Sequence, residues 1–502
     1  MILATNRRSK TPASALMRCI FTGSAILTIF SLGMIIVLLF RESFGFFPEY
    51  RKSIATYRSS GLEYVDLLNE RYDAFMEIDQ QLTQLRADWI RYLERQKLSS
   101  EHLQEELQKG PLAQLFGEYR ATINPVRAYI DRKRLFAIEN KNKSWKTGAA
   151  ISGIKSTLKG DLEQYTILLE ALAVETERLF ARAEKSTIGM PNVESRIEKL
   201  AARNRAYHRG RNLHIQELHS WEGNRPVEQS DAIKSFFRGR EWISASVQQN
   251  WYGLLPLLTG SLFIATIAIG LAVPIGVGAA IYVNMLAGPK ERALLKPAIE
   301  FIAALPAVVV GFFGLMVFGA FVQSLSQSDL FAWLPFFEIQ ERLNAFTAGT
   351  LLALMAIPTI FTLTEEALFT VRGEIKEASF AIGATRLQTA FRIVVPSAFP
   401  GIISAVLLGF GRVIGETIIV LLCAGNRARI PDLSEGLPAV FEPVHTMTGM
   451  IAQEMGEVLY GDLHFRALFM VGLMLFLLSL VINYAAQSLA ERHRQTQAGY
   501  RR

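Results

Sequence analysis

The chain has 502 residues, half of them hydrophobic, and a mean hydropathy of +0.22. Its 53 basic and 46 acidic residues give a formal net charge of +7, but the basic residues gather at the ends of apolar segments and no nucleic-acid motif accompanies them, which argues against a nucleic-acid-binding protein. The hydrophobic residues concentrate in the first forty positions and after Trp251. This distribution indicates a membrane protein with one large aqueous insertion.

Six apolar segments are long enough to cross a bilayer. They cover residues 19–40, 253–286, 301–323, 346–364, 397–425 and 467–489. The first is longer than the apolar core of a signal peptide and no small-residue cleavage site follows it, so we expect a membrane helix there. The second contains Pro274, which permits a tilt or a kink at that point.

Basic residues orient these segments, because cytoplasmic loops carry an excess of Lys and Arg. They cluster before the first segment, after the second, in the loop at 365–396 and at the end of the chain (Arg7, Arg8, Lys10, Arg18; Lys290, Arg292, Lys296; Arg372, Lys376, Arg386, Arg392; Arg492, Arg494, Arg501, Arg502). We therefore expect both termini and the loop at 365–396 to be cytoplasmic. The insertion between the first two segments is then extracytoplasmic.

The insertion carries apolar residues at spacings of three and four, which is typical of helices that bury one face. The strongest stripe contains Val65, Leu68, Tyr72, Phe75, Ile78, Leu82, Leu85, Trp89 and Tyr92, and weaker ones cover 158–179 and 193–218. Gly110-Pro111 and residues 188–191 indicate breaks between helices. The pattern predicts a helical hairpin or a small, coiled-coil-like bundle.

These patterns divide the chain into four parts. Residues 1–40 form a cytoplasmic N-terminus and the first membrane helix, and residues 41–235 form the helical insertion. Residues 236–490 form a membrane core with five further helices and the loop at 365–396. Residues 491–502 form a basic cytoplasmic tail.

The loop before the fifth apolar segment has a distinctive pattern, EASFAIGATRLQTAFRIVVP, over residues 377–396. Glycine at position 383 can adopt a turn conformation that is closed to other residues, and Pro396 suits the start of a helix. The pattern predicts a short helix, a turn and a second helix that returns to the bilayer. An ordinary amphipathic connector is the alternative.

This pattern resembles the EAA loop of ABC importer permeases, the segment on which the ATPase subunit docks. The segments at 253–282, 296–315, 407–426 and 443–457 resemble the corresponding regions of phosphate importer permeases of the PstC type, and the resemblance covers the first span and about residues 230–502. It implies an all-α membrane protein with six transmembrane helices. It also implies ATPase docking through Glu377, Ala378, Gly383 and Pro396. Three mild departures are Ala307, Val413 and Ile414, and the insertion is not part of the shared core.

Arg412 and Glu416 lie inside an otherwise uncharged span, next to Thr417. The spacing of four places Arg412 and Glu416 on one helix face, where they can pair. Charged residues at membrane depth are costly and normally face a partner or a water-filled path. Two interpretations follow from the residues: a structural pair, or a transport path in which Arg412 meets an oxyanion. The resemblance favours the transport path for Arg412, Glu416 and Thr417.

Other sites of chemistry are not indicated. The chain has no G-x-x-x-x-G-K-[ST] motif for ATP and no hydrolase motif. His208, His214 and His219 lack the spacing of a helical metal pair, and Cys19 and Cys423 lie in apolar spans, so no disulfide framework is expected. We expect no cofactor in this chain.

The resemblance implies the permease subunit of an ABC importer for inorganic phosphate in a bacterial inner membrane. The expected partners are a second, related permease, two ATP-binding subunits that carry ATP and Mg²⁺, a periplasmic phosphate-binding protein and membrane lipid, but no nucleic acid. Two alternatives stay open. One is a permease for molybdate or sulfate, and the other is a phosphate-sensing scaffold with a degenerate permease core.

Overall fold

The computed structural model describes residues 12–95, 111–147, 153–186, 191–223, 225–246, 248–328, 339, 341–433 and 436–499. The predicted breaks at residue 110 and at 188–190 lie outside the described residues, as do the basic residues at 7, 8, 10, 501 and 502. The chain separates into two units. The membrane unit comprises Met1–Tyr50, Gln229–Ser244 and Asn250–Arg502, and the helical unit comprises Arg51–Glu228 and Ala245–Gln249.

Six helices of the described residues are long and apolar enough to cross a membrane, which confirms the predicted all-α membrane architecture. They are Ile20–Ser59, Leu255–Leu286, Ala307–Ser326, Ala345–Phe369, Arg386–Ile414 and Leu463–Glu491. The first does not end at residue 40, because α1 (Pro12–Ser59) continues without a break. Arg41 and Glu42 follow the apolar stretch and are good helix formers, so no local signal stops the helix there.

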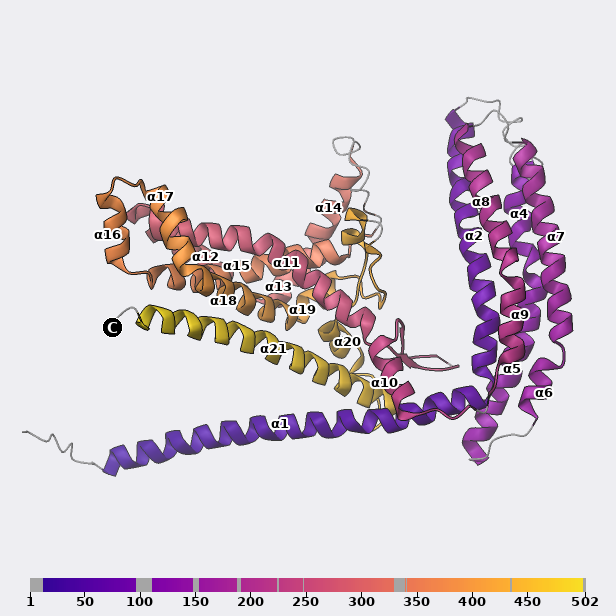
Figure 1. Cartoon of the computed structure of the whole chain (residues 1–502), viewed down its shortest axis with the longest axis horizontal. Helices are drawn as coiled ribbons and strands as arrows, with labels where there is room; N and C mark the ends of the chain where they lie inside the picture. The colour runs from indigo at the N-terminus through magenta and orange to yellow at the C-terminus, as the bar shows by residue number, and fades with distance from the viewer. Residues whose placement is uncertain are drawn as a thin grey trace, which may run out of the picture. The chain divides into compact units, whose positions relative to one another are not determined.

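The core of the membrane unit is built around α15 (Ala345–Phe369), which is the most buried of the six. It packs against α11 (Leu255–Ile281) and α18 (Val395–Ile414), and α18 packs in turn against α21 (Leu463–Gly499) (Figure 1). Small residues permit this contact: a Cβ added at Gly349 would lie 2.6 Å from Ile267 Cγ2, and one added at Gly409 would lie 2.7 Å from Ile360 Cγ1. Close helix approach at glycine is the usual way that membrane helices gain packing energy.

Two predicted spans have different bounds in the structure. The third begins at Ala307 rather than at 301, because α12 (Pro289–Ile302) ends first and Pro306 precedes α13 (Ala307–Phe313). It continues through a π-helical turn, η2 (Gly314–Phe318), into α14 (Gly319–Ser326). The fifth begins much earlier than 397, at Arg386, and ends at Ile414. The separate short helix α19 (Ile418–Cys423) covers the rest of the predicted segment.

Short elements complete the membrane unit. Helix α10 (Gln229–Arg238) leads into a two-stranded antiparallel ribbon, β1 (Trp242–Ile243) with β2 (Trp251–Tyr252), in which Trp242 pairs with Tyr252. Helix α11 is extended by the π-helical turn η1 (Tyr282–Leu286), and the 3₁₀ helix η5 (Leu437–Phe441) precedes α20 (Met447–Glu454). Trp242 is buried.

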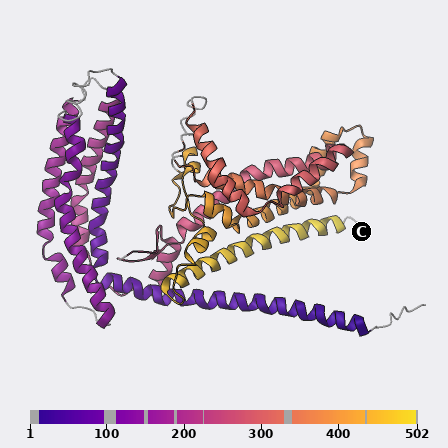
Figure 2. The same ribbon diagram turned by 180° about the vertical axis from the view of Figure 1, so that it is seen from behind.

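The helical unit is a bundle, as the apolar stripes predict. Its helices are α2 (Leu62–Arg95), α4 (Pro111–Thr122), α5 (Asn124–Thr147), α6 (Ile154–Lys159), α7 (Leu162–Ser186), α8 (Pro191–Arg209) and α9 (Arg211–Ser220). Figure 2 shows the long helices lying side by side. Stripe residues such as Leu82, Tyr165 and Ile197 are buried in it, whereas Tyr72 is only partly buried. The chain enters α2 through Gly61, whose φ of +87° breaks the helix after Ser59.

Candidate functional site

The EAA-like loop has the expected helix–turn–helix form. Helix α16 (Gly373–Ala381) is followed by Gly383, whose φ of +86° reverses the chain. Helix α17 (Arg386–Thr389) then begins with a capping box, in which Thr385 and Gln388 satisfy each other's backbone amides. A glycine is needed at position 383 because the left-handed region is strained for other residues.

Two contacts fix the angle between the arms of this loop. The buried hydroxyls of Ser379 and Thr389 lie 2.9 Å apart, and the amide of Ala384 donates to the carbonyl of Ser379 at 3.2 Å. The base of the loop packs into an apolar cluster that includes Phe361 and Val394. Because these contacts are internal, the outer face of the loop is held rigidly without using its exposed side chains.

The outer face of the loop is apolar as well as charged. Glu377 and Ala378 are exposed, and Ile382 is 84% exposed. Leu387 and Phe391 are more than half exposed on the returning arm. An exposed apolar patch on a rigid loop is typical of a protein-binding surface.

Pro396 occupies the first turn of α18, but it does not start the helical path. That path begins ten residues earlier at Arg386, and the π-helical turn η3 (Ala390–Val394) joins α17 to α18. Pro396 therefore lies at the start of a helix, as the sequence predicts, but this helix continues a helical path that begins earlier. The wider π turn ends two residues before Pro396, which cannot donate the usual helical hydrogen bond.

Arg412 and Glu416 do not form the predicted pair. Helix α18 ends at Ile414, so Glu416 is not one turn further along the same helix. Among the ion pairs of the described residues, none joins these two side chains. The exposed Arg412 donates instead from Nη1 to Thr359 Oγ1 of α15 at 2.6 Å.

Glu416 accepts hydrogen bonds from backbone amides at the start of α19. Its Oε1 lies 3.2 Å from the amide of Thr417 and 3.3 Å from the amide of Ile418. Both amides would otherwise lack helical partners, so the carboxylate stabilises the helix start. Glu416 and Thr417 are half-buried, and they line the break between α18 and α19 beside Arg412.

The segment at 443–457, which resembles a region of the PstC-type permeases, reaches into this break. Thr448 Oγ1 of α20 donates to the carbonyl of Glu416 at 2.9 Å, and the amide of Met447 donates to Ser261 Oγ of α11 at 2.9 Å. A Cβ added at Gly260 would lie 2.1 Å from the carbonyl oxygen of His445. The start of α20 is thus buried among the membrane helices, and only the small residues Gly260 and Ser261 could have indicated it in the sequence.

The far end of α20 is held by Glu454. Its carboxylate accepts from Trp242 Nε1 at 3.1 Å and from Ser244 Oγ at 2.7 Å, and it lies 2.8 Å from His464 Nε2. Burial alone would raise the pKa of Glu454, but the hydrogen bonds from His464, Ser244 and Trp242 outweigh it and lower the pKa. Sequence analysis missed this site because Trp242 and Ser244 lie more than 200 residues before Glu454 in the chain.

A second carboxylate was also missed. Glu365, near the end of α15, is nearly buried and pairs with Arg292 at 3.1 Å and Lys296 at 2.7 Å, both on α12. Two cations for one carboxylate fix α12 to the end of α15 beside the EAA-like loop. In the sequence, Glu365 directly follows the apolar span at 346–364, and this position could have indicated the ion pairs. Within the described residues, no group of His, Cys, Asp or Glu is placed to hold a metal ion.

Comparison with known proteins identifies the family. Residues 272–495 match the family described as the binding-protein-dependent transport system inner membrane component. The phosphate transport system permease protein PstC of Pasteurella multocida is 31% identical over 256 residues, which cover 49% of this chain and 77% of that protein. A probable ABC transporter permease, YqgH of Bacillus subtilis, is 31% identical over 48% of this chain and 73% of its own length.

A solved structure of the inward-facing MetNI methionine ABC transporter aligns with 48% of this chain and 94% of its own chain, at 17% identity and a TM-score of 0.35. The assignment depends on the sequence relatives and not on this alignment. The chain belongs to the binding-protein-dependent inner membrane components, as an ABC transporter permease of the PstC phosphate type.

Proposed function

We propose that this chain forms half of an inorganic phosphate channel that works by ATP-driven alternating access. One observation carries the proposal: the returning arm of the exposed EAA-like loop and Arg412 lie on one continuous helical path, Arg386–Ile414. Twenty-six residues separate Arg386 from Arg412, which corresponds to about 39 Å along a helix. A movement of the loop is therefore transmitted directly to the arginine across the thickness of a bilayer.

The chemistry of Arg412 supports an oxyanion as the substrate. A guanidinium group matches phosphate oxygens, and it stays charged under all physiological conditions. Arg412 is exposed in the isolated chain, and its known partner is the neutral hydroxyl of Thr359 rather than a carboxylate. Its positive charge is therefore available to an anion, which the names of the PstC relatives suggest is phosphate.

The proposed assembly has a second, homologous permease, two ATP-binding subunits and a periplasmic phosphate-binding protein. The second permease covers the exposed face that carries Arg412 and Ile418, and the ATPases dock on the EAA-like loops. ATP binding draws the loops together, and the path opens to the binding protein on the outer side. Hydrolysis takes place on the ATPase subunits. Both termini are cytoplasmic and the helical unit is extracytoplasmic, in accordance with the distribution of basic residues.

The test is phosphate uptake in cells that lack the native chain. The unmodified protein should restore uptake, and Arg412→Gln should reach the membrane and retain its ATPase partner without restoring it. Arg427→Gln is a matched control, since Arg427 pairs with Glu341 in a loop of the same unit. Normal uptake by Arg412→Gln would exclude the transport-path role. Uptake of molybdate or sulfate in place of phosphate would favour the alternative oxyanion permease.

A further inference from the structure

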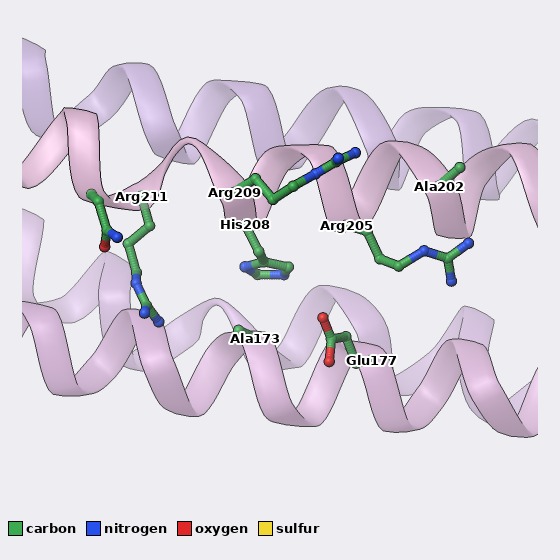
Figure 3. A pocket seen from close by; sticks show the side chains of 8 residues that line it. Ala173, Glu177, Ala202, Arg205, His208, Arg209 and Arg211 are labelled. Carbon is green, nitrogen blue, oxygen red and sulfur yellow. The ribbon is translucent and has the colours of Figure 1, made fainter.

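The helical unit contains a groove that faces solvent and is rich in arginine. Its volume is about 670 Å³, and its walls come from α7 (Ala173, Glu177), α8 (Ala202, Arg205, His208, Arg209) and α9 (Arg211, Asn212). Figure 3 shows Arg205, His208 and Arg211 pointing toward the facing helix that carries Ala173 and Glu177. The volume lies within the usual range of small-molecule sites.

The arginines are only weakly engaged within the protein. Arg205 lies 3.6 Å from Glu184 and Arg211 lies 3.5 Å from Glu170, and both pairs are partly exposed. Such distances are longer than a good charge-assisted hydrogen bond, and exposed pairs of this kind contribute little. Within the described residues, Arg209 has no ion pair. The guanidinium groups of Arg205 and Arg211 can therefore turn toward a ligand, whereas Arg209 points away from the facing helix (Figure 3).

A partly buried cation adds to the positive field of the groove. The Arg71 guanidinium stacks on the ring of Tyr207 at 4.0 Å, next to the break between α8 and α9. Its Nε and Nη2 atoms are buried and have no hydrogen-bond partner among the described residues. Burial first, and then the charges of Arg71 and Arg211, lower the pKa of His208 to about 4. His208 is therefore neutral, and the positive field comes from arginine.

We propose that this groove binds an anion that carries more than one phosphoryl group. Arg205 on α8 and Arg211 on α9 are six residues apart, which corresponds to about 9 Å at the rise of a helix. That separation suits charges at two positions of one ligand better than a single phosphate ion. Guanidinium groups bind phosphoryl oxygens in a bidentate manner. Glu177 is the one acidic residue in the lining, and it limits the affinity.

The test is a calorimetric titration of the full-length protein, in phosphatidylcholine nanodiscs, with sodium tripolyphosphate. We expect saturable binding, which becomes at least about tenfold weaker in the double variant Arg205→Gln, Arg211→Gln. Glu177→Gln should bind several-fold more tightly, because it removes a repulsion. Arg203→Gln is the matched control: it lies on the same helix but pairs with Glu77, and it should bind like the unmodified protein.

Two results would overturn the proposal: the same affinity in the double variant, or weaker binding by Glu177→Gln, provided that far-UV circular dichroism shows unchanged helix content. Orthophosphate should bind at least several-fold more weakly than tripolyphosphate, and equal affinity would contradict a ligand with several phosphoryl groups. Nanodiscs with cardiolipin, a lipid that carries two phosphoryl groups, distinguish the source of those groups. If cardiolipin weakens tripolyphosphate binding by the unmodified protein but not by the double variant, the groove binds lipid phosphates, and unchanged binding assigns it to a soluble anion.

Discussion

At the scale of single residues, the charged groups of the membrane unit depend on partners of different kinds. Arg412 contacts a hydroxyl, Glu416 contacts backbone amides, and Glu365 contacts two cations. A buried carboxylate that pairs with two cations has a structural role, because removing the carboxylate or the cations leaves an uncompensated charge. An arginine whose partner is a hydroxyl is not neutralised by a carboxylate, and an anion path requires such an unneutralised positive charge.

Thr359 should position Arg412 for transport. Thr359→Val keeps the shape of the side chain but removes the hydroxyl that accepts from Nη1. A hydrogen bond to a charged group contributes about 1.5–3 kcal/mol, so we expect kcat/KM for phosphate uptake to fall about tenfold. Thr359→Ser should restore it. Equal uptake by the Val and Ser variants, at equal amounts in the membrane, would rule out this role.

Glu454 should make the membrane unit sensitive to acid. Its pKa in the folded protein lies below the ordinary value of 4.5, so its contribution to stability is complete above about pH 4.5 and is lost as the pH falls through the folded pKa. At pH 7, Glu454→Gln should lose about 1–2 kcal/mol. Thermal unfolding of the purified protein, measured from pH 7 to about pH 3, should show the two curves converging below about pH 4.5.

Glu457→Gln serves as the control for Glu454, since Glu457 is exposed on the turn after α20. Its unfolding curve should follow that of the unmodified protein at every pH. A constant difference between Glu454→Gln and the unmodified protein, with no convergence at low pH, would show that ionisation of Glu454 does not contribute.

At the scale of elements, the EAA-like loop combines a rigid interior with an exposed outer face. The Ser379–Thr389 hydrogen bond and the turn at Gly383 set its shape. The exposed residues are then free to bind a partner without taking part in folding. Mutations in the interior and on the outer face should therefore have different consequences.

Glu377→Lys should abolish docking of the ATPase without changing the fold, because Glu377 is exposed. We expect the variant to reach the membrane in normal amounts and to lose both the co-purifying ATPase and phosphate uptake. Glu300→Lys makes the same charge change at an exposed position of α12 and should behave normally. Gly383→Ala should be milder, since strain at a positive φ costs about 1–3 kcal/mol. Retention of the ATPase by Glu377→Lys would contradict the docking role.

At the scale of the whole molecule, the two units have different surfaces. The first membrane helix exposes apolar side chains such as Phe21, Ile29 and Phe30, as a lipid-facing helix does. The helical unit instead carries many exposed ion pairs, for example Arg203 with Glu77, which suits an aqueous environment. The distribution of basic residues predicts the side of the membrane on which this unit lies.

Cysteine labelling should place the helical unit outside the cytoplasmic membrane. Ile167 is 59% exposed on α7, and Ile382 is 84% exposed on the EAA-like loop. An impermeant thiol reagent should label Ile167→Cys in cells opened only at the outer membrane. Ile382→Cys should react only after the inner membrane is lysed. The reverse pattern would invert the topology, and the unmodified chain measures the background of the native cysteines.

The sequence by itself determined the features that depend on local periodicity. Spans such as Leu255–Leu286 and stripe residues such as Leu82 follow from hydropathy and from spacings of three and four, and these patterns act within a few helical turns. Gly383 was predictable because a positive φ is a property of the single residue. Burial of an apolar side chain requires only that it lie on the inward face of its helix, so it does not depend on which apolar residue packs against it.

Only the tertiary structure decided which polar groups meet. Spacing placed Arg412 beside Glu416, but the helix ends at Ile414 and each side chain contacts another element. The burial of α20, and the contact of Glu454 with Trp242, join segments that are far apart in the chain. A hydrogen bond requires two particular atoms within about 3 Å. That condition depends on how the helices pack, and no local pattern in the sequence records it.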